Sequence, residues 1–186
     1  VTGEIDASTL LKVGTNNTEY ANNYIRFKPA GAAYIDHNTV GQDINFRTSV
    51  SSSLDTTPVI IKAGGSVGLG VTPGAWSANY PSLQIGQGAT FTGHRSNTQT
   101  QLGQNWWVGT GNQYVVDGAA SRLVMGQDSS ITFSQAPSGT AGATMSSTTN
   151  PLVINAAGNV GIGTALADID CSLDVTRTSG WAEMHL

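Results

Sequence analysis

One segment of this chain occurs twice, and this repeat constrains the fold more than any other feature of the sequence. Residues 56–70 read TTPVIIKAGGSVGLG and residues 149–163 read TNPLVINAAGNVGIG, so that Pro58 aligns with Pro151. A second pair of similar segments, FKPAGAAYIDHNTVGQDINF and YVVDGAASRLVMGQDSSITF, lies upstream of the two copies. Internal repetition of this kind indicates an architecture of repeated units.

The repeat divides the chain into four parts. Each unit opens with a similar strand, LKVG at residue 11, LQIG at residue 83 and LDV at residue 173. We therefore expect a shaft-like lead-in at residues 1–10, a first β-unit at 11–82, a second at 83–172, and the start of a third unit or the C-terminal end at 173–186. The second unit is the longer one, and an insertion near residues 93–107 accounts for most of the difference.

Composition and periodicity predict the all-β class. The 186 residues are 39% hydrophobic and 11% charged, with 23 Gly, which is too apolar for a disordered tail and unlike a helical bundle. Short segments such as IRF, INF and ITF place alternate apolar residues on one face of a strand. The runs VII after Pro58 and LVI after Pro151 are apolar on both faces, so we expect those strands to be covered on both sides.

Glycine alternates with apolar residues directly after these runs, in VGLG and VGIG. A glycine within a strand usually marks the close approach of another backbone, and we expect a second and a third copy of the chain to supply it. Units of this size with few large apolar side chains would also bury too little surface to fill separate cores. The sequence therefore predicts that three copies associate, with trimer packing at Gly68, Gly70, Gly161 and Gly163.

Charge and residue types argue against several functional classes. The net charge is −4 and the eight Lys and Arg stand singly, so no nucleic-acid partner is expected. No run of about 18 apolar residues occurs, which argues against membrane insertion. The three His residues are far apart and Cys171 is alone, so we expect no metal site, and Asp36 beside His37 is interpreted as a solvated turn. The glycine repeats do not match a dinucleotide fingerprint, and no cofactor is expected.

The segment NPLVINAAGNVGIGT, followed ten residues after Gly163 by LDV, resembles a motif of bacteriophage tail fibres and of related fibres that end in an autocleaved, endosialidase-type intramolecular chaperone. The resemblance covers residues 149–175 most fully and the first copy, at 56–86, in part. It implies an intertwined homotrimer rich in β-structure, carried on the virion with other tail proteins and used to bind a glycan or protein of the host surface. The motif is structural, so it does not identify the receptor.

The insertion in the second unit is the candidate receptor-binding segment. Residues 92–114, TGHRSNTQTQLGQNWWVGTGNQY, combine two adjacent Trp with a His, an Arg and several amides. Inserted loops on a rigid scaffold tend to carry function, and this composition suits a glycan because Trp rings stack on sugars while amides and Arg bond hydroxyl groups. The candidate contacts are His94, Arg95, Gln104, Asn105, Trp106, Trp107 and Tyr114.

The aromatic residues of this region also have a structural interpretation. Adjacent residues of a strand point to opposite faces, so at most one of Trp106 and Trp107 is expected in the core of the chain. The alternative is that both pack within the trimer. Trp76 and Tyr80, in PGAWSANYPS, form a second aromatic turn with the same two interpretations.

The acidic residues bear on whether the chain is an enzyme. Glycoside hydrolysis usually needs two carboxylates facing one cleft, and the units hold few: Asp36, Asp43, Asp55, Asp117 and Asp128. Asp43 and Asp128 both follow GQ, which predicts a turn role for each. We therefore expect no enzymatic activity. A polysaccharide depolymerase module with acids from different copies, and a bacterial surface adhesin or lectin stalk, are the alternatives.

Overall fold

The computed structural model of the chain describes residues 35, 37–163 and 172–176. Across these residues all regular structure is β-strand, which confirms the all-β class. Several sequence predictions fall outside the described residues: the lead-in at 1–10, the opening strand of the first unit at residue 11, the role of Asp36, and the chain after residue 176.

The described residues form thirteen strands joined by turns and loops. The strands are β1 Ile44–Thr48, β2 Thr56–Ile61, β3 Val67–Leu69, β4 Ser82–Ile85, β5 Ala89–Gly93, β6 Thr100–Gln104, β7 Trp106–Val108, β8 Asn112–Tyr114, β9 Gly118–Met125, β10 Ile131–Gly139, β11 Thr149–Ile154, β12 Val160–Ile162 and β13 Leu173–Val175. Eleven of them form one large sheet, and the β7–β8 hairpin forms a small sheet of its own.

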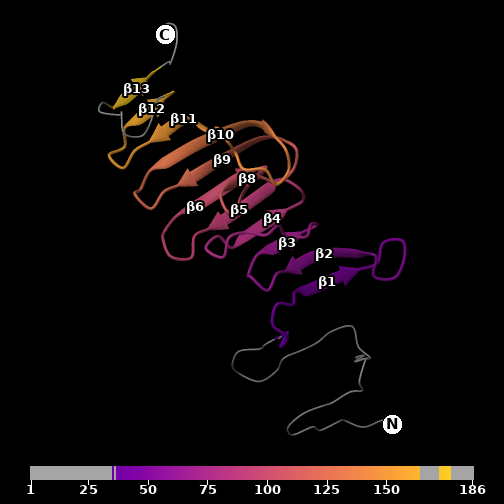
Figure 1. Cartoon of the computed structure of the whole chain (residues 1–186). Helices are drawn as coiled ribbons and strands as arrows, with labels where there is room; N and C mark the ends of the chain where they lie inside the picture. Colours follow the sequence, from indigo (N-terminus) through magenta and orange to yellow (C-terminus); the bar gives the residue numbers. More distant parts are fainter. Residues whose placement is uncertain (1–34, 36, 164–171, 177–186) are drawn as a thin grey trace, which may run out of the picture. The chain divides into compact units, whose positions relative to one another are not determined.

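The large sheet adds its strands in the order of the chain, from β1 to β6 and then from β9 to β13 (Figure 1). The β7–β8 hairpin leaves the sheet between β6 and β9, which pair directly with each other. Neighbouring strands are antiparallel except for β3–β4 and β12–β13, which are parallel. Each parallel step follows a Val-Gly-aliphatic strand, so it occurs once after each copy of the repeated segment.

The two copies of the repeated segment have the same strand register. Ile44 of β1 pairs with Ile61 of β2, and Ile131 of β10 pairs with Ile154 of β11. In both ladders the register shifts after the third pair, as at a β-bulge. The following ladders, β2–β3 and β11–β12, match pair for pair. The sequence likeness therefore corresponds to one local β-structure that is formed twice.

Glycines of the repeat serve the chain's own turns and close contacts. Gly70 and Gly163 have left-handed φ angles of 66° and 74°, and their N–H groups donate to the carbonyl of the proline in the preceding strand at 2.9 and 3.0 Å. Gly68 and Gly161 are buried at matching positions. A Cβ on Gly68 would overlap the carbonyl of Val71. The backbone that approaches Gly68 therefore belongs to the same chain, and trimer packing at the four glycines stays a prediction.

One face of the large sheet is covered by the chain's own loops, and polar and apolar side chains are buried there together. The N–H of Gly74 donates to the Gln84 side chain at 3.2 Å, which holds the loop after β3 against this face. The buried polar side chains of this face are Ser82, Gln84, Thr90, Thr92, Gln101 and Ser134. The main apolar cluster, to which the β7–β8 hairpin and residues 140–148 contribute, consists of Trp106, Tyr114, Ala120, Ala136 and Met145. Further buried apolar side chains on the same face are Ile60, Val124 and Val153.

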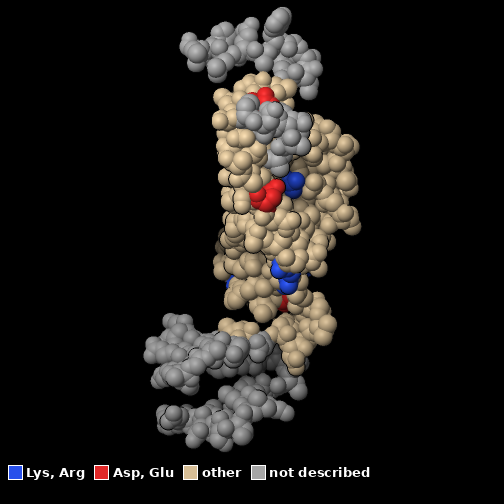
Figure 2. Space-filling model, turned by 90° about the vertical axis from the view of Figure 1, so that its left-hand side faces the viewer, with Lys and Arg blue, Asp and Glu red and all other residues tan. Residues whose placement is uncertain are grey.

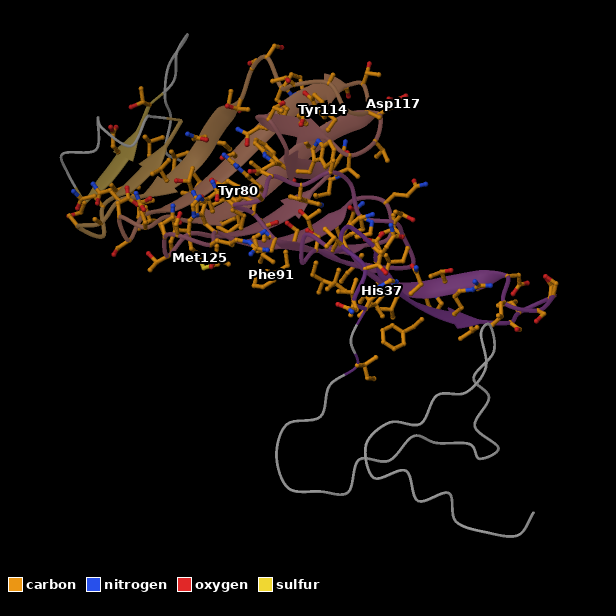
Figure 3. All side chains as sticks on the ribbon, turned by 60° about the horizontal axis from the view of Figure 1, so that its bottom comes forward. His37, Tyr80, Phe91, Tyr114, Asp117 and Met125 are labelled. Atoms are coloured by element: carbon orange, nitrogen blue, oxygen red, sulfur yellow. The ribbon has the colours of Figure 1, made fainter. Side chains whose placement is uncertain are left out.

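The opposite face of the large sheet is apolar, and no described residue covers it. Directly paired residues share a face, so Phe91, Leu102 and Leu123 form a continuous row across three strands. We call this surface the apolar face. Its large exposed side chains, each 36–51% exposed, are Phe46, Leu69, Ile85, Phe91, Leu102, Met125, Phe133, Ile162, Leu173 and Val175. Figure 3 shows Phe91 and Met125 on one side of the sheet and Tyr114 on the other.

Candidate functional site

Trp106 belongs to the core of the chain. It begins β7, is 2% exposed, and shares the core cluster with Tyr114 and Met145. Its Nε1 donates to Asn112 Oδ1 at 3.1 Å, and the guanidinium carbon of Arg122 lies 4.3 Å from the centroid of its ring. The indole N–H group and the ring of Trp106 therefore both make contacts within the fold.

Asn105 and Tyr114 are buried as well. Asn105 is 1% exposed and has a φ of 54°, a left-handed conformation that Asn adopts more readily than most residues. Its Nδ2 donates to the Ala119 carbonyl at 3.0 Å, and its Oδ1 accepts the Val116 N–H at 2.7 Å. The Tyr114 hydroxyl donates to the Pro137 carbonyl at 2.6 Å. Packing and turn formation thus account for three of the seven predicted receptor contacts.

Trp107 points away from this cluster and forms an aromatic pair with Trp76. The two ring centroids are 6.1 Å apart and the planes meet edge to face at 82°. Both residues are half-buried, and a Cβ on Gly74 would overlap the Trp107 ring. The different surroundings of Trp106 and Trp107 agree with the expected alternation along a strand.

His94 and Arg95 lie in the turn between β5 and β6. The His94 ring packs edge to face on Tyr80 with centroids 4.6 Å apart, and its Nδ1 accepts the Ser96 N–H at 3.1 Å. Arg95 is exposed, and its Nη2 donates to the Gly64 carbonyl at 2.8 Å. His94 is therefore tied into the turn, whereas Arg95 presents a positive charge at the surface.

Gln104 lies on the other side of the large sheet. It ends β6 on the apolar face, is exposed, and accepts a hydrogen bond of 3.4 Å from the hydroxyl of Ser121. The seven predicted contacts therefore do not form one site. Three are buried, Trp107 is half-buried, His94 and Arg95 share a turn, and Gln104 faces the opposite way.

A pocket of about 480 Å³ joins Arg95 to Trp76 and to the β2–β3 turn. Lys62 from that turn also lines the pocket, and its Nζ lies 2.7 Å from Asp43 Oδ2. Lys62 was not among the predicted site residues, although comparison of the two copies of the repeat distinguishes it. Lys62 aligns with Asn155 in the second copy of the repeat, so a cation occupies this turn in only one of the two copies.

Carboxyl groups of the described residues bind backbone or hydroxyl groups of nearby loops. Three successive N–H groups at residues 50–52 donate to Asp55 and hold the pKa of its carboxyl far below the usual range. Hydrogen bonds from Ser130 lower the pKa of Asp128, which agrees with the turn role predicted for this residue. Asp43 differs, because its carboxylate joins the start of β1 to the β2–β3 turn, and its lysine partner lowers its pKa.

The chain matches no protein-family model, and no curated protein matches it in sequence. Within the described ranges there is no group of three or more potential metal ligands and no helix long and apolar enough to cross a membrane. Charged side chains are sparse on the surface drawn in Figure 2. The two faces of the large sheet and the pocket beside Arg95 are the features of the described residues that bear on function.

Proposed function

We propose that this chain is a structural and receptor-binding segment of a bacteriophage tail fibre, which assembles as a homotrimer on the virion and attaches it to the host cell surface. The single observation that carries this proposal is the uncovered apolar face. The resemblance of the repeated segment to tail fibres supplies the biological setting and favours three copies over two. Catalysis is not part of the proposal.

In a monomeric sheet the face that is not covered is expected to be polar, whereas the uncovered face of this large sheet is apolar. Ser, Thr and Gln side chains lie beneath the chain's own loops, whereas Phe, Leu and Ile side chains face outward. Contiguous apolar patches larger than a few hundred Å² mark interaction surfaces in soluble proteins. Because the apolar face extends over the eleven strands of the sheet, a partner must offer an equally long apolar surface. Another copy of the chain offers one.

The free energy available from covering this face is large. Full burial of a Leu, Ile or Phe side chain contributes about 1.5–3 kcal/mol. The ten large side chains of the apolar face are each 36–51% exposed, so covering them contributes about 1 kcal/mol each, or about 10 kcal/mol per chain. That contribution is comparable with the stability of a whole domain, about 5–15 kcal/mol. It would also give the VII and LVI strands the cover on both sides that their sequences predict.

Association through the apolar face leaves the loop-bearing face pointing outward. That face carries the loop after β3 and the β7–β8 hairpin, and the β5–β6 turn lies beside them. Loops held on a rigid sheet are where binding residues concentrate. Three equivalent sets of loops on one particle gain avidity from their linkage, so each contact with a host glycan or protein can be weak.

Native mass spectrometry of the purified chain tests assembly, and binding of the labelled chain to a panel of bacteria tests attachment. We expect three chains per particle at micromolar concentration, and saturable binding that unlabelled chain competes away. A soluble monomer that unfolds cooperatively would refute the trimeric architecture. A trimer that binds no bacterial surface in a panel containing the host would refute the attachment role.

A further inference from the structure

The pocket beside Arg95 is built by three separate segments of the chain. Lys62 and Gly64 come from the β2–β3 turn, Trp76 comes from the loop after β3, and Arg95 comes from the β5–β6 turn. None of these residues lies on the apolar face. The pocket therefore stays accessible when that face is covered by other copies of the chain.

Arg95 is held at this pocket by backbone contacts. Its Nη2 donates to the Gly64 carbonyl at 2.8 Å, and its own N–H donates to the Asn79 carbonyl at 2.9 Å. Gly65 leaves room for the guanidinium, since a Cβ there would lie 2.9 Å from Nη2. Among the described residues no carboxylate pairs with Arg95. Its positive charge is therefore uncompensated.

The second cation of the pocket is already neutralised. Lys62 Nζ lies 2.7 Å from Asp43 Oδ2, and the other oxygen of that carboxylate accepts the Ala63 N–H at 2.9 Å. The side chains of Lys62 and Asp43 are 35% and 24% exposed, so water screens this pair only in part. The net positive charge of the pocket is thus the charge of Arg95.

Trp76 supplies an apolar wall. Its half-buried ring contacts Trp107 edge to face and lines the pocket together with Gly74 and Ser77. Indole faces stack on the apolar faces of sugar rings, while hydroxyl and backbone groups bond sugar hydroxyls. A guanidinium beside such a wall adds a preference for carboxylate, because its planar fork matches the two carboxylate oxygens.

We propose that this pocket binds a carboxylate-bearing sugar residue of a host surface polysaccharide, with the carboxylate on Arg95 and the sugar ring against Trp76. The assignment rests on the proposed function, because it names the class of receptor that the fibre recognises. A neutral sugar would give the Arg95 guanidinium no anionic acceptor. A small carboxylate without a sugar ring would make no contact with the Trp76 indole. Uronic acids and sialic acids share the required chemistry.

Calorimetric titration of the purified trimer tests the assignment with three matched oligosaccharides, ending in glucuronate, in N-acetylneuraminate or in galactose. We expect one of the two acidic probes to bind about tenfold or more tightly than the neutral probe, because the acidic probe adds a hydrogen bond between charged groups. Which acidic probe binds identifies the kind of acid. The affinity should fall as ionic strength rises. Equal affinity for the neutral probe, or no binding of either acidic probe, would overturn the assignment.

Substitutions locate the binding in this pocket. Arg95→Gln should weaken binding of the acidic probe about tenfold or more through loss of the charged hydrogen bond, and Trp76→Ala should weaken it as well. Arg47→Gln is the matched control, because Arg47 also donates to a backbone carbonyl, that of Leu54 at 3.3 Å, and does not line the pocket. It should bind as the unmodified chain does. Unchanged affinity in Arg95→Gln would place the site elsewhere.

Native mass measured on the same samples separates this assignment from the proposed function. A trimer that attaches to bacteria but does not bind the acidic probes refutes the sugar site alone. A chain that fails to form trimers refutes the proposed function, whatever its affinity for sugars.

Discussion

Replacing Leu102 by Asp tests whether copies of the chain cover the apolar face. Leu102 pairs with Phe91 and Leu123 on this face and is 47% exposed. Leu54 is 51% exposed and lies in the turn between β1 and β2, away from the apolar face. The two substitutions remove the same side chain from nearly equal exposure, so the lost burial would cost an isolated chain a similar free energy in both cases.

The expected effects differ widely if copies pack on the apolar face. In an isolated chain, either change removes partial burial worth about 1 kcal/mol. In a trimer, Leu102→Asp removes about 1 kcal/mol more from each chain and places three carboxylates in an apolar interface, where desolvation costs several kcal/mol per ion. The total is on the order of 10 kcal/mol per trimer, or roughly seven decades in the association constant.

Sedimentation velocity and native mass spectrometry measure the outcome directly. The unmodified chain and Leu54→Asp should both give three chains per particle, whereas Leu102→Asp should give single chains or aggregates. The control should fold normally, since Leu54 already has a φ of 53° and Asp adopts this conformation more readily than Leu. Trimers formed by Leu102→Asp at the same concentration as the unmodified chain would show that the apolar face is not the interface.

Three further predictions concern single side chains. Trp106→Ala should lower the free energy of unfolding by about 3–5 kcal/mol because the ring is 2% exposed, and Trp107→Ala should lower it less; equal losses in denaturant titrations would contradict the burial difference. Gly163→Val should destabilise the chain for two reasons: its φ of 74° is unfavourable for Val, and the added Cβ would overlap a nearby carbonyl. Gly158→Val, with a φ of 86° and no atom near the added Cβ, should show only the cost of the left-handed backbone, about 1–2 kcal/mol. Because the pKa of Asp55 is lowered in the folded chain, its contribution to stability is complete above the pKa of the unfolded chain, about 3.9, and is lost as the pH falls through the folded pKa. Asp55→Asn should therefore make the melting temperature fall less steeply as the pH is lowered through the acid range.

The strands of the repeat could be predicted because their signals are local. The apolar run after Pro58 or Pro151 is followed by a turn in which Gly65 or Gly158 has φ near 90°, at 89° and 86°. The Val-Gly-aliphatic segment then pairs back on the run in the same register both times. A short hairpin with a glycine turn is specified by neighbours in sequence, so no knowledge of distant residues was needed.

The candidate site could be predicted only in part, because burial depends on distant segments. The composition of residues 106–114, WWVGTGNQY, is equally consistent with a ligand-binding loop and with a tight hairpin. Residues 140–148 decide between the two interpretations for Trp106 and Tyr114, since this loop bonds to β8 at Asn112 and Tyr114 and completes the core. Likewise, the contact between Arg95 and the β2–β3 turn joins segments 31 residues apart, which no local pattern specifies.

The order of strands in the large sheet has a consequence for how the chain is made. Within the part of the chain that the structure describes, and apart from the β7–β8 hairpin, each strand of the large sheet pairs with the strand synthesised just before it, so its partner is already present in the growing chain. Short loops close at little entropic cost, and folds dominated by local contacts form quickly. The sheet can therefore lengthen while translation continues. In the proposed trimer only the association of copies requires another chain, and we expect nascent chains on one messenger to associate first.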